Sequence, residues 1–239
     1  KILIKNHENI KIYHYRSGFG GVSVDYAKTK NIFCICDHTI AHPTIVEYMI
    51  ENKGNFPTKK IPMRNNWWKL VISDINNADL VLANSNFVKQ TLIFMGCKTP
   101  IKVIYTGVSK SFENNILFKK KYFINNSINI LYSGGLVKRK GLDEIQDFIK
   151  NIDTSKNFNL ELAGGLSTLS KFKYKDLLNN KNVKYLGILN SKDLSKSYNK
   201  ADIFLFPSLV EGSAKVIFEA MAAGCAVITT PNSGSIVEH

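Results

Sequence analysis

The sequence predicts an α/β protein whose parallel sheets are covered by helices on both faces. Short, continuous apolar runs of strand length alternate along the chain with longer segments of helical periodicity. Strands that are apolar throughout and are separated by helices are typical of parallel sheets buried on both sides. The pattern occurs twice within the 239 residues and is interrupted once by a polar stretch. We therefore expect two doubly wound domains.

The first half contains four strand-length runs with helical patterns between them. The strands are predicted at Ile10–Tyr15, Ile32–Cys36, Leu80–Ala83 and Lys102–Tyr105. Helical periodicity is found at Gly21–Thr29, Thr44–Asn52, Asn66–Asn76 and Asn86–Phe94.

The second half begins after a polar stretch at Ser109–Ser127, which carries a lysine triplet and little amphipathic pattern. We place an N-terminal Rossmann-like domain at residues 1–118 and a second one at 119–239. The predicted strands of the second half are Ile128–Tyr132, Asn159–Ala163, Val183–Leu186, Ile203–Phe206 and Ala226–Thr229. Its predicted helices are Leu142–Asn151, Tyr174–Asn179, Lys192–Asn199 and Ser213–Ala223.

Composition limits the class of protein. A hydrophobic content of 44% with 21% charged residues indicates a globular chain. The first residue is Lys1 and the end is abrupt, so we expect a fragment truncated at both ends, with both domains incomplete. No two-cysteine spacing completes a zinc site, and the four cysteines fit buried thiols of a reducing, cytoplasmic compartment.

The formal net charge of +13 leaves three explanations open. They are binding of nucleic acid, attraction to an anionic membrane surface, and binding of an anionic small substrate; a habit of composition without functional meaning is the alternative to all three. The lysines are scattered and form no basic run with interleaved aromatics, so no nucleic-acid partner is expected. Trp67 and Trp68 suggest either helix packing or a docking surface, and peripheral membrane association stays open.

The strongest motif runs from Pro207 to Gly224, where a buried strand turns into a helix. Glu211 and Gly212 lie in the turn, and Ser213 is expected to cap the helix. The free amides of a helix start suit phosphate or sugar oxygens. Glu219 is the single carboxylate on an otherwise apolar helix face and needs a partner. An ion pair with Lys215 is the ordinary alternative.

This paired-glutamate turn and helix resemble glycosyltransferase family 4 (group 1), retaining enzymes with the GT-B fold of two Rossmann-like domains facing a cleft. The resemblance implies that Glu219 binds the ribose of the donor nucleotide and that Glu211 contacts the donor sugar as a catalytic residue. It places the backbone of Gly212 and Ser213 at the sugar or diphosphate. The match continues from Thr229 to Ser235.

A second basic, glycine-rich segment follows the first strand of the second domain, from Ser133 to Gly141. Its cations suit a diphosphate leaving group without a metal ion. It resembles the family's phosphate-binding segment, so Gly135, Arg139 and Lys140 are predicted diphosphate ligands. Many family members carry arginine where this chain has Gly135. No Asp-X-Asp metal motif is present, and no metal or cofactor is expected.

Two further predictions concern the strand ends. His38 resembles the family's histidine that projects toward the donor sugar, and it is a predicted catalytic residue. The segment Arg16–Gly21 either cradles phosphate or lines the acceptor side, although it lacks a dinucleotide spacing. Nucleotide base binding is expected at Gly164, Gly187 and Ile188, after the second and third strands of the second domain.

The sequence therefore predicts a retaining, hexosyltransferase-like glycosyltransferase. Its donor would be a nucleotide-diphosphate sugar such as a UDP-sugar, and its acceptor a polysaccharide, lipid-linked or other glycan. Two alternatives stay open, a nucleotide-sugar epimerase of the same fold and a non-catalytic nucleotide- or carbohydrate-binding module.

Overall fold

The computed structural model describes residues 7–113, 127–152 and 157–235. Contacts divide the chain into two compact units. The first comprises the residues up to Thr106 together with the segment Glu211–Ser213, and the second comprises Gly107–Val210 and Ala214–Ser235. The predicted domain boundary between residues 118 and 119 lies outside the described residues.

The first unit contains a four-stranded parallel sheet with the order β1-β2-β3-β4. Its strands are β1 (Ile12–Arg16), β2 (Phe33–His38), β3 (Leu80–Ala83) and β4 (Ile101–Val103). Its helices are η1 (His7–Asn9), α2 (Val22–Thr29), α3 (Pro43–Glu51), α4 (Trp68–Asn77) and α5 (Asn86–Met95). Helices α2 and α4 pack against β2, while α5 packs against β3 and β4.

Local sequence explains where these helices begin and end. Ser85 caps α5, because its Oγ accepts a hydrogen bond from the amide of Val88. Gly96 ends the same helix at φ 99°, a left-handed conformation that glycine adopts without strain. Pro43 occupies the first turn of α3, where its missing amide hydrogen is not needed.

The second unit contains a five-stranded parallel sheet with the order β7-β6-β5-β8-β9. Its strands are β5 (Ile128–Ser133), β6 (Phe158–Ala163), β7 (Val183–Gly187), β8 (Ile203–Phe206) and β9 (Ala226–Thr229). Its helical segments are η2 (Lys110–Phe112), η4 (Lys138–Lys140), α6 (Leu142–Asn151), α7 (Thr168–Lys173), α8 (Lys175–Leu178), α9 (Ser191–Lys200), α10 (Lys215–Ala222) and η5 (Pro231–Ser233).

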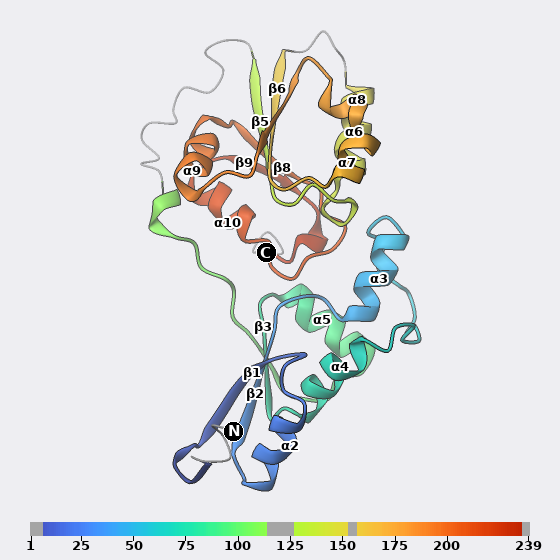
Figure 1. Cartoon of the computed structure of the whole chain (residues 1–239), viewed down its shortest axis with the longest axis vertical. Helices are drawn as coiled ribbons and strands as arrows, with labels where there is room; N and C mark the ends of the chain where they lie inside the picture. The colour runs from blue at the N-terminus through green and yellow to red at the C-terminus, as the bar shows by residue number, and fades with distance from the viewer. Residues whose placement is uncertain (1–6, 114–126, 153–156, 236–239) are drawn as a thin grey trace. The chain divides into compact units, whose positions relative to one another are not determined.

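The strand order of the second unit contains a reversal of direction at the middle of the sheet. The chain runs outward from β5 to β7 and then returns to β8 on the other side of β5. Within this unit, α6, α7 and α8 lie on one face of the sheet and α9 and α10 on the other (Figure 1). The direction reverses between β5 and β8, and open parallel sheets bind ligands at the carboxyl ends of the strands beside such a point.

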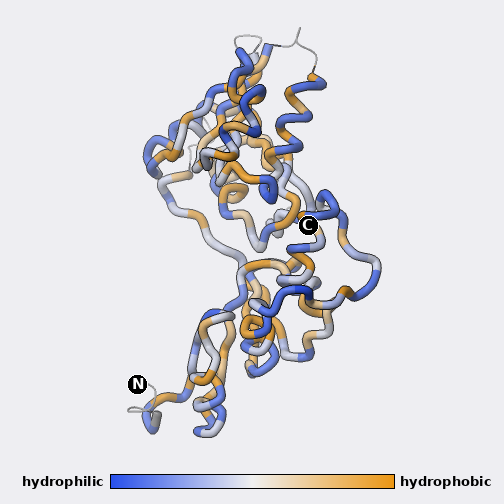
Figure 2. The backbone as a smooth tube through the Cα atoms, turned by 45° about the vertical axis from the view of Figure 1, so that its right-hand side comes forward, coloured by the Kyte–Doolittle hydropathy of each residue, from blue (hydrophilic) through white to orange (hydrophobic). Residues whose placement is uncertain are grey.

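The cores follow from the predicted apolar pattern. Hydrophobic residues recur along the strands and helices with hydrophilic ones between them (Figure 2). Fully buried aromatic side chains of Tyr132, Phe204 and Phe206 stack in the second unit, with ring centroids of neighbouring pairs 5.7 and 6.0 Å apart. Such offset aromatic contacts stabilise a core beyond the area they bury. The predicted α/β class with two parallel sheets is confirmed.

Two predicted elements need correction. Helix α10 begins at Lys215 and not at Ser213, and its N-cap Ala214 makes no side-chain capping bond. Helix α7 was not predicted, and none of its residues is buried. None of the helices in the described part of the chain has the length and hydrophobicity needed to cross a bilayer.

Candidate active site

Three glycine turns meet at the carboxyl edge of the second sheet. The amide of Gly134 donates to Ala163 O at 2.9 Å, and the amide of Gly164 donates to Gly187 O at 2.7 Å. Gly164 has φ 145°, and a Cβ atom there would overlap the carbonyl of Gly134. The turns after β5, β6 and β7 are therefore stacked backbone to backbone. This arrangement brings Gly164 and Gly187 beside the turn that carries Gly135.

Ile188 directly follows this stack and exposes its side chain to solvent. It lies beside the turn after β6, since a Cβ on Gly165 would be 3.7 Å from Ile188 Cδ1. Gly135 has open space around its Cα, with nothing within 4 Å of a Cβ placed there. The carboxyl edge of the second sheet thus has the exposed apolar side chain of Ile188 and, at Gly135, backbone that no side chain covers.

The basic turn after β5 is tied to the turn after β8. Leu209 donates its amide to Arg139 O at 2.9 Å, and Arg139 Nη1 donates to Val210 O at 2.8 Å. Gly141 allows this approach: it has φ 83°, and a Cβ there would overlap the carbonyl of Pro207. The guanidinium of Arg139 therefore holds the neighbouring turn. Lys140 lies with its Nζ 5.8 Å from the ring centroid of Phe206, at the end of β8.

Glu219 is buried on α10 and has two partners within the second unit. Tyr198 Oη donates to its Oε2 at 3.2 Å, and Lys215 Nζ lies 3.7 Å from its Oε1. Burial raises the pKa of the Glu219 carboxyl, while Lys215 and the Tyr198 hydroxyl oppose that rise. The ion pair with Lys215 is thus present, but the ammonium is half exposed and distant for a strong bond. The ribose role of Glu219 stays a prediction.

The turn Glu211–Ser213 belongs by its contacts to the first unit. Ser85 Oγ donates to Gly212 O at 2.5 Å, and a Cβ on Gly212 would overlap the carbonyl of Thr39. Only glycine permits this approach. Ser213 Oγ is buried and has no hydrogen-bond partner within residues 7–113, 127–152 and 157–235, although it was expected to cap α10. A buried hydroxyl without a partner is rare in native proteins and requires an explanation.

His38 ends β2 and is buried. Its Nδ1 lies 2.8 Å from Ser17 Oγ, and its buried Nε2 has no hydrogen-bond partner among the residues that the structure describes. Burial, together with the neighbouring His42, lowers the pKa of His38 to about 4. The imidazole is therefore neutral at physiological pH. The neighbouring His42 caps α3, because its Nδ1 accepts a hydrogen bond from the amide of Thr44.

The glycine loop Arg16–Gly21 is filled by a carboxylate of the chain itself. The amides of Gly18, Gly20 and Gly21 each donate to the buried side chain of Asp74 at 2.8 Å. These donors are consequently not available to a phosphate, and the phosphate-loop interpretation is wrong. The loop instead places Ser17 against His38, and Arg16 Nη2 donates to Thr39 Oγ1 at 2.8 Å.

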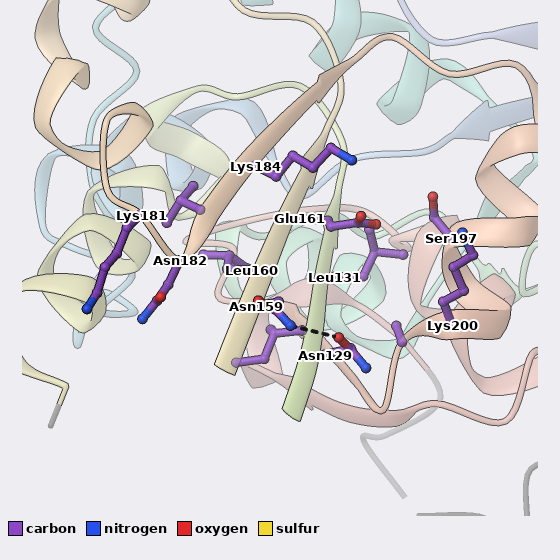
Figure 3. Close-up of a pocket in the computed structure, with 13 residues that line it drawn as sticks. Asn129, Leu131, Asn159, Leu160, Glu161, Lys181, Asn182, Lys184, Ser197 and Lys200 are labelled. Carbon is purple, nitrogen blue, oxygen red and sulfur yellow. Dashed lines mark hydrogen bonds between the residues drawn. The ribbon is translucent and has the colours of Figure 1, made fainter. Parts of the chain in front are cut away.

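A cavity of about 510 Å³ lies at the other end of the second sheet. It is lined by residues at the starts of β5, β6 and β7 and at the end of α9, among them Asn129, Asn159, Lys184 and Lys200 (Figure 3). Asn159 Nδ2 donates to Asn129 Oδ1 at 3.3 Å across its floor. This cavity is at the amino edge of the strands, so it is not part of the site predicted at their carboxyl ends.

All four cysteines are free thiols, and three of them are buried. Across residues 7–113, 127–152 and 157–235, no group of three or more His, Cys, Asp or Glu side chains is arranged to hold a metal ion.

Comparison with known proteins identifies the family. Residues 114–238, more than half of the chain, match the model of the family described as glycosyl transferases group 1. The chain belongs to this family.

Relatives in bacteria and archaea agree with this assignment. An uncharacterized glycosyltransferase of Methanocaldococcus jannaschii is 31% identical over 160 residues, covering 62% of the chain and 41% of that protein. The Staphylococcus aureus capsular polysaccharide biosynthesis glycosyltransferase CapM is 31% identical over 171 residues, covering 65% of the chain and 44% of CapM. The chain thus spans less than half the length of these relatives.

Solved structures show the fold. Sucrose-phosphate synthase from Thermosynechococcus elongatus superposes with a TM-score of 0.72 at 17% identity, covering 98% of the chain and 59% of that structure. Anabaena HepE in complex with UDP gives the same TM-score and identity over 98% of the chain and 63% of HepE. The GT-B fold class predicted from the sequence is confirmed.

Proposed function

We propose that the protein is a retaining glycosyltransferase that moves a sugar from a nucleotide-diphosphate sugar to a glycan or lipid-linked acceptor. The observation that carries this proposal is the contact between two turns at the carboxyl edge of the second sheet. The basic turn Lys138–Lys140 is held against the turn after β8 by backbone and guanidinium bonds. Family membership supports the same activity.

The donor diphosphate would lie beside the place where these two turns are in contact. Uncovered backbone at Gly135 and the ammonium of Lys140 would contact its oxygens. As the bond from the sugar C1 to the diphosphate oxygen breaks, negative charge grows on the leaving group, and a nearby cation stabilises it. The acceptor oxygen forms the new bond to C1, and its proton passes to the departing phosphate oxygen. Arg139 would act indirectly by holding the turn.

The nucleoside would extend from the diphosphate toward the glycine stack. Ile188 would pack against the base, and the turns at Gly164 and Gly187 would supply backbone contacts. Glu219 would accept hydrogen bonds from the ribose hydroxyls. A carboxylate that is kept in a buried position with a raised pKa is a recognised feature of ligand sites.

The sugar would be held by groups that the chain itself leaves unpaired. His38 Nε2 and Ser213 Oγ are buried polar atoms without partners, and sugar hydroxyls would satisfy both. In the tautomer in which Ser17 Oγ donates to Nδ1, the imidazole hydrogen lies on Nε2, and His38 would then be a neutral donor to the sugar. Glu211 would contact the donor sugar from the same turn as Ser213.

Three similar proteins suggest which substrates to propose. CapM is named for capsular polysaccharide biosynthesis, and AmsK of Erwinia amylovora for amylovoran biosynthesis. HepE has been crystallised with UDP-glucose. A UDP-hexose donor and a growing surface polysaccharide acceptor are accordingly the first substrates to test. We also propose that the transfer takes place in the cytoplasm.

The test is incubation of the protein with a panel of sugar-labelled nucleotide sugars, with and without glycan acceptors. Transfer with the anomeric configuration of the donor, or slow release of free sugar, supports the proposal. Isomerised sugar on an intact nucleotide would instead show an epimerase. Tight binding without any turnover would show a non-catalytic module.

A further inference from the structure

One face of the second sheet is polar over part of its area. Four polar side chains occupy neighbouring register positions there: Asn129 on β5, Asn159 and Glu161 on β6, and Lys184 on β7. Residues that pair across strands, or that lie two apart along one strand, point to the same face of a sheet. Strands of a parallel sheet covered by helices are normally apolar throughout. This part of the face is therefore not built as hydrophobic core.

These four side chains line the cavity of about 510 Å³ at the amino edge of the sheet (Figure 3). On the same face, α9 packs against β5, and α10 packs against β8 and β9. The last turn of α9 contributes Ser197 and Lys200 to the wall of the cavity. Small-molecule sites in proteins commonly have volumes in this range. The cavity is therefore large enough for a small ligand.

The chain leaves several polar groups around this cavity unpaired. Ser197 exposes only 9% of its surface, and its hydroxyl has no hydrogen-bond partner among the described residues. A buried hydroxyl without a partner in the protein is rare. Within the described ranges, Glu161, Lys184 and Lys200 form no ion pair. These four side chains are consequently available to a ligand.

The kinds of group around the cavity define the chemistry of that ligand. The Glu161 carboxylate lies between Lys184 on β7 and Lys200 on α9 (Figure 3). The two ammonium groups attract an anion, whereas the carboxylate repels a bare anion and accepts hydrogen bonds from donors. The carboxamides of Asn129 and Asn159 add further donors and acceptors. A ligand that matches all of these groups carries negative charge together with hydroxyl groups.

The lining argues against a nucleotide in this cavity. The described residues that line it include no aromatic side chain, so a base would have no ring to stack on. We propose that the cavity binds an acidic sugar. Its carboxylate or phosphate contacts Lys184 and Lys200, and its ring hydroxyls bond to Glu161 and Ser197. This second site is at the opposite edge of the sheet from the proposed diphosphate site and shares no residue with it, so the two proposals stand or fall separately.

The test is a titration of isotope-labelled protein, followed by NMR, with glucuronic acid and with mannose 6-phosphate. Glucose and inorganic phosphate are the control ligands, because each carries only one half of the required chemistry. The side-chain amide resonances of Asn129 and Asn159 report occupancy of the cavity directly. We expect an acidic sugar to shift them and to bind at least about tenfold more tightly than either control, and the better of the two sugars identifies the acidic group. Equal binding of inorganic phosphate would show an adventitious ion only and overturn the proposal.

Lysine variants place the ligand within the cavity. Lys184→Gln and Lys200→Gln each remove one ammonium group, and each should weaken binding of the acidic sugar by about tenfold. Lys192→Gln removes an equally exposed lysine of the same helix α9 outside the cavity, and it should leave the affinity unchanged. Ser197→Ala should weaken binding by about threefold or more, since a sugar hydroxyl loses its partner. Binding of neither acidic sugar, or equal losses in Lys192→Gln and Lys200→Gln, would also refute the site.

Discussion

Replacement of Gly141 by alanine tests whether the basic turn and the turn after β8 are in contact. Gly141 has φ 83°, a left-handed conformation that costs an alanine about 1–2 kcal/mol. The new Cβ would also overlap the carbonyl of Pro207, so the turns must separate. The hydrogen bond from Leu209 N to Arg139 O would be lost, at about 0.5–1.5 kcal/mol. We expect a total destabilisation of about 2–4 kcal/mol.

Two matched glycines separate these contributions. Gly187 has φ 72° but nothing within 4 Å of a Cβ, so Gly187→Ala should cost only the conformational strain of about 1–2 kcal/mol. Gly135 has neither a left-handed φ nor a neighbour, so Gly135→Ala should be neutral or stabilising by up to about 1 kcal/mol.

Urea unfolding followed by far-UV circular dichroism measures the series. Both tryptophans lie in the first unit, so their fluorescence reports that unit separately. If Gly141→Ala is no less stable than Gly187→Ala, the two turns do not abut and the proposed diphosphate site is not formed as described.

The remaining predictions concern buried charge. Burial lowers the pKa values of His38 and His42 to about 4 in the folded state, so stability present above pH 6.5 should decline as the pH falls toward 4. At pH 5 the free energy of unfolding should be lower by about 2 kcal/mol for each histidine. Urea unfolding followed by tryptophan fluorescence measures this decrease, and the His38→Gln variant should show half of it. A free energy of unfolding that does not change with pH would contradict the burial of the two histidines. Asp74→Asn should destabilise the first unit by about 3 kcal/mol or more, because three backbone amides lose a carboxylate acceptor. Asp25→Asn, at an exposed position, should change the stability by at most about 0.5 kcal/mol. Equal effects of the two substitutions would show that Asp74 does not anchor the loop. Because the pKa of Glu219 is raised in the folded state, ionisation of its carboxyl lowers the stability of the fold as the pH rises through that pKa. The Glu219→Gln variant should therefore be at least as stable as the unmodified chain at pH 7. This advantage should disappear below pH 4.5, where the carboxyl is protonated in both the folded and the unfolded state. A lower melting temperature for Glu219→Gln at pH 7 would show that the carboxylate serves packing and not a ligand.

Much of the fold could be predicted because parallel strands leave a strong signal. Runs such as Leu80–Ala83 and Ile203–Phe206 are apolar throughout, and the structure has strands with those bounds. Element ends were less predictable. Ser213 satisfies the residue preference of a cap, yet α10 begins two residues later, because tertiary contacts of Gly212 and Ala214 fix the turn.

Only those site residues that belong to a recognisable sequence motif could be predicted. The turn after β8 and the basic turn after β5 stand out in sequence, and the structure ties them together. By contrast, the partners Tyr198 and Ser17 lie far along the chain from Glu219 and His38 and carry no pattern of their own.

Asp74 offered a weak signal that was missed. It is an acid in the apolar series of α4, and such an acid requires a partner. The partner is the backbone of the Arg16–Gly21 loop, for which a phosphate-binding role was one of two predicted alternatives.

Titration of the protein with UDP-glucose, GDP-mannose and ADP-glucose by calorimetry tests the central claim most directly. We predict that one of these donors binds and that Glu219→Gln weakens its affinity by about tenfold or more, since a ribose hydroxyl loses a charged acceptor. Binding of no donor, or equal affinity in the Glu219→Gln variant, would contradict a nucleotide-sugar site at the carboxyl edge of the second sheet.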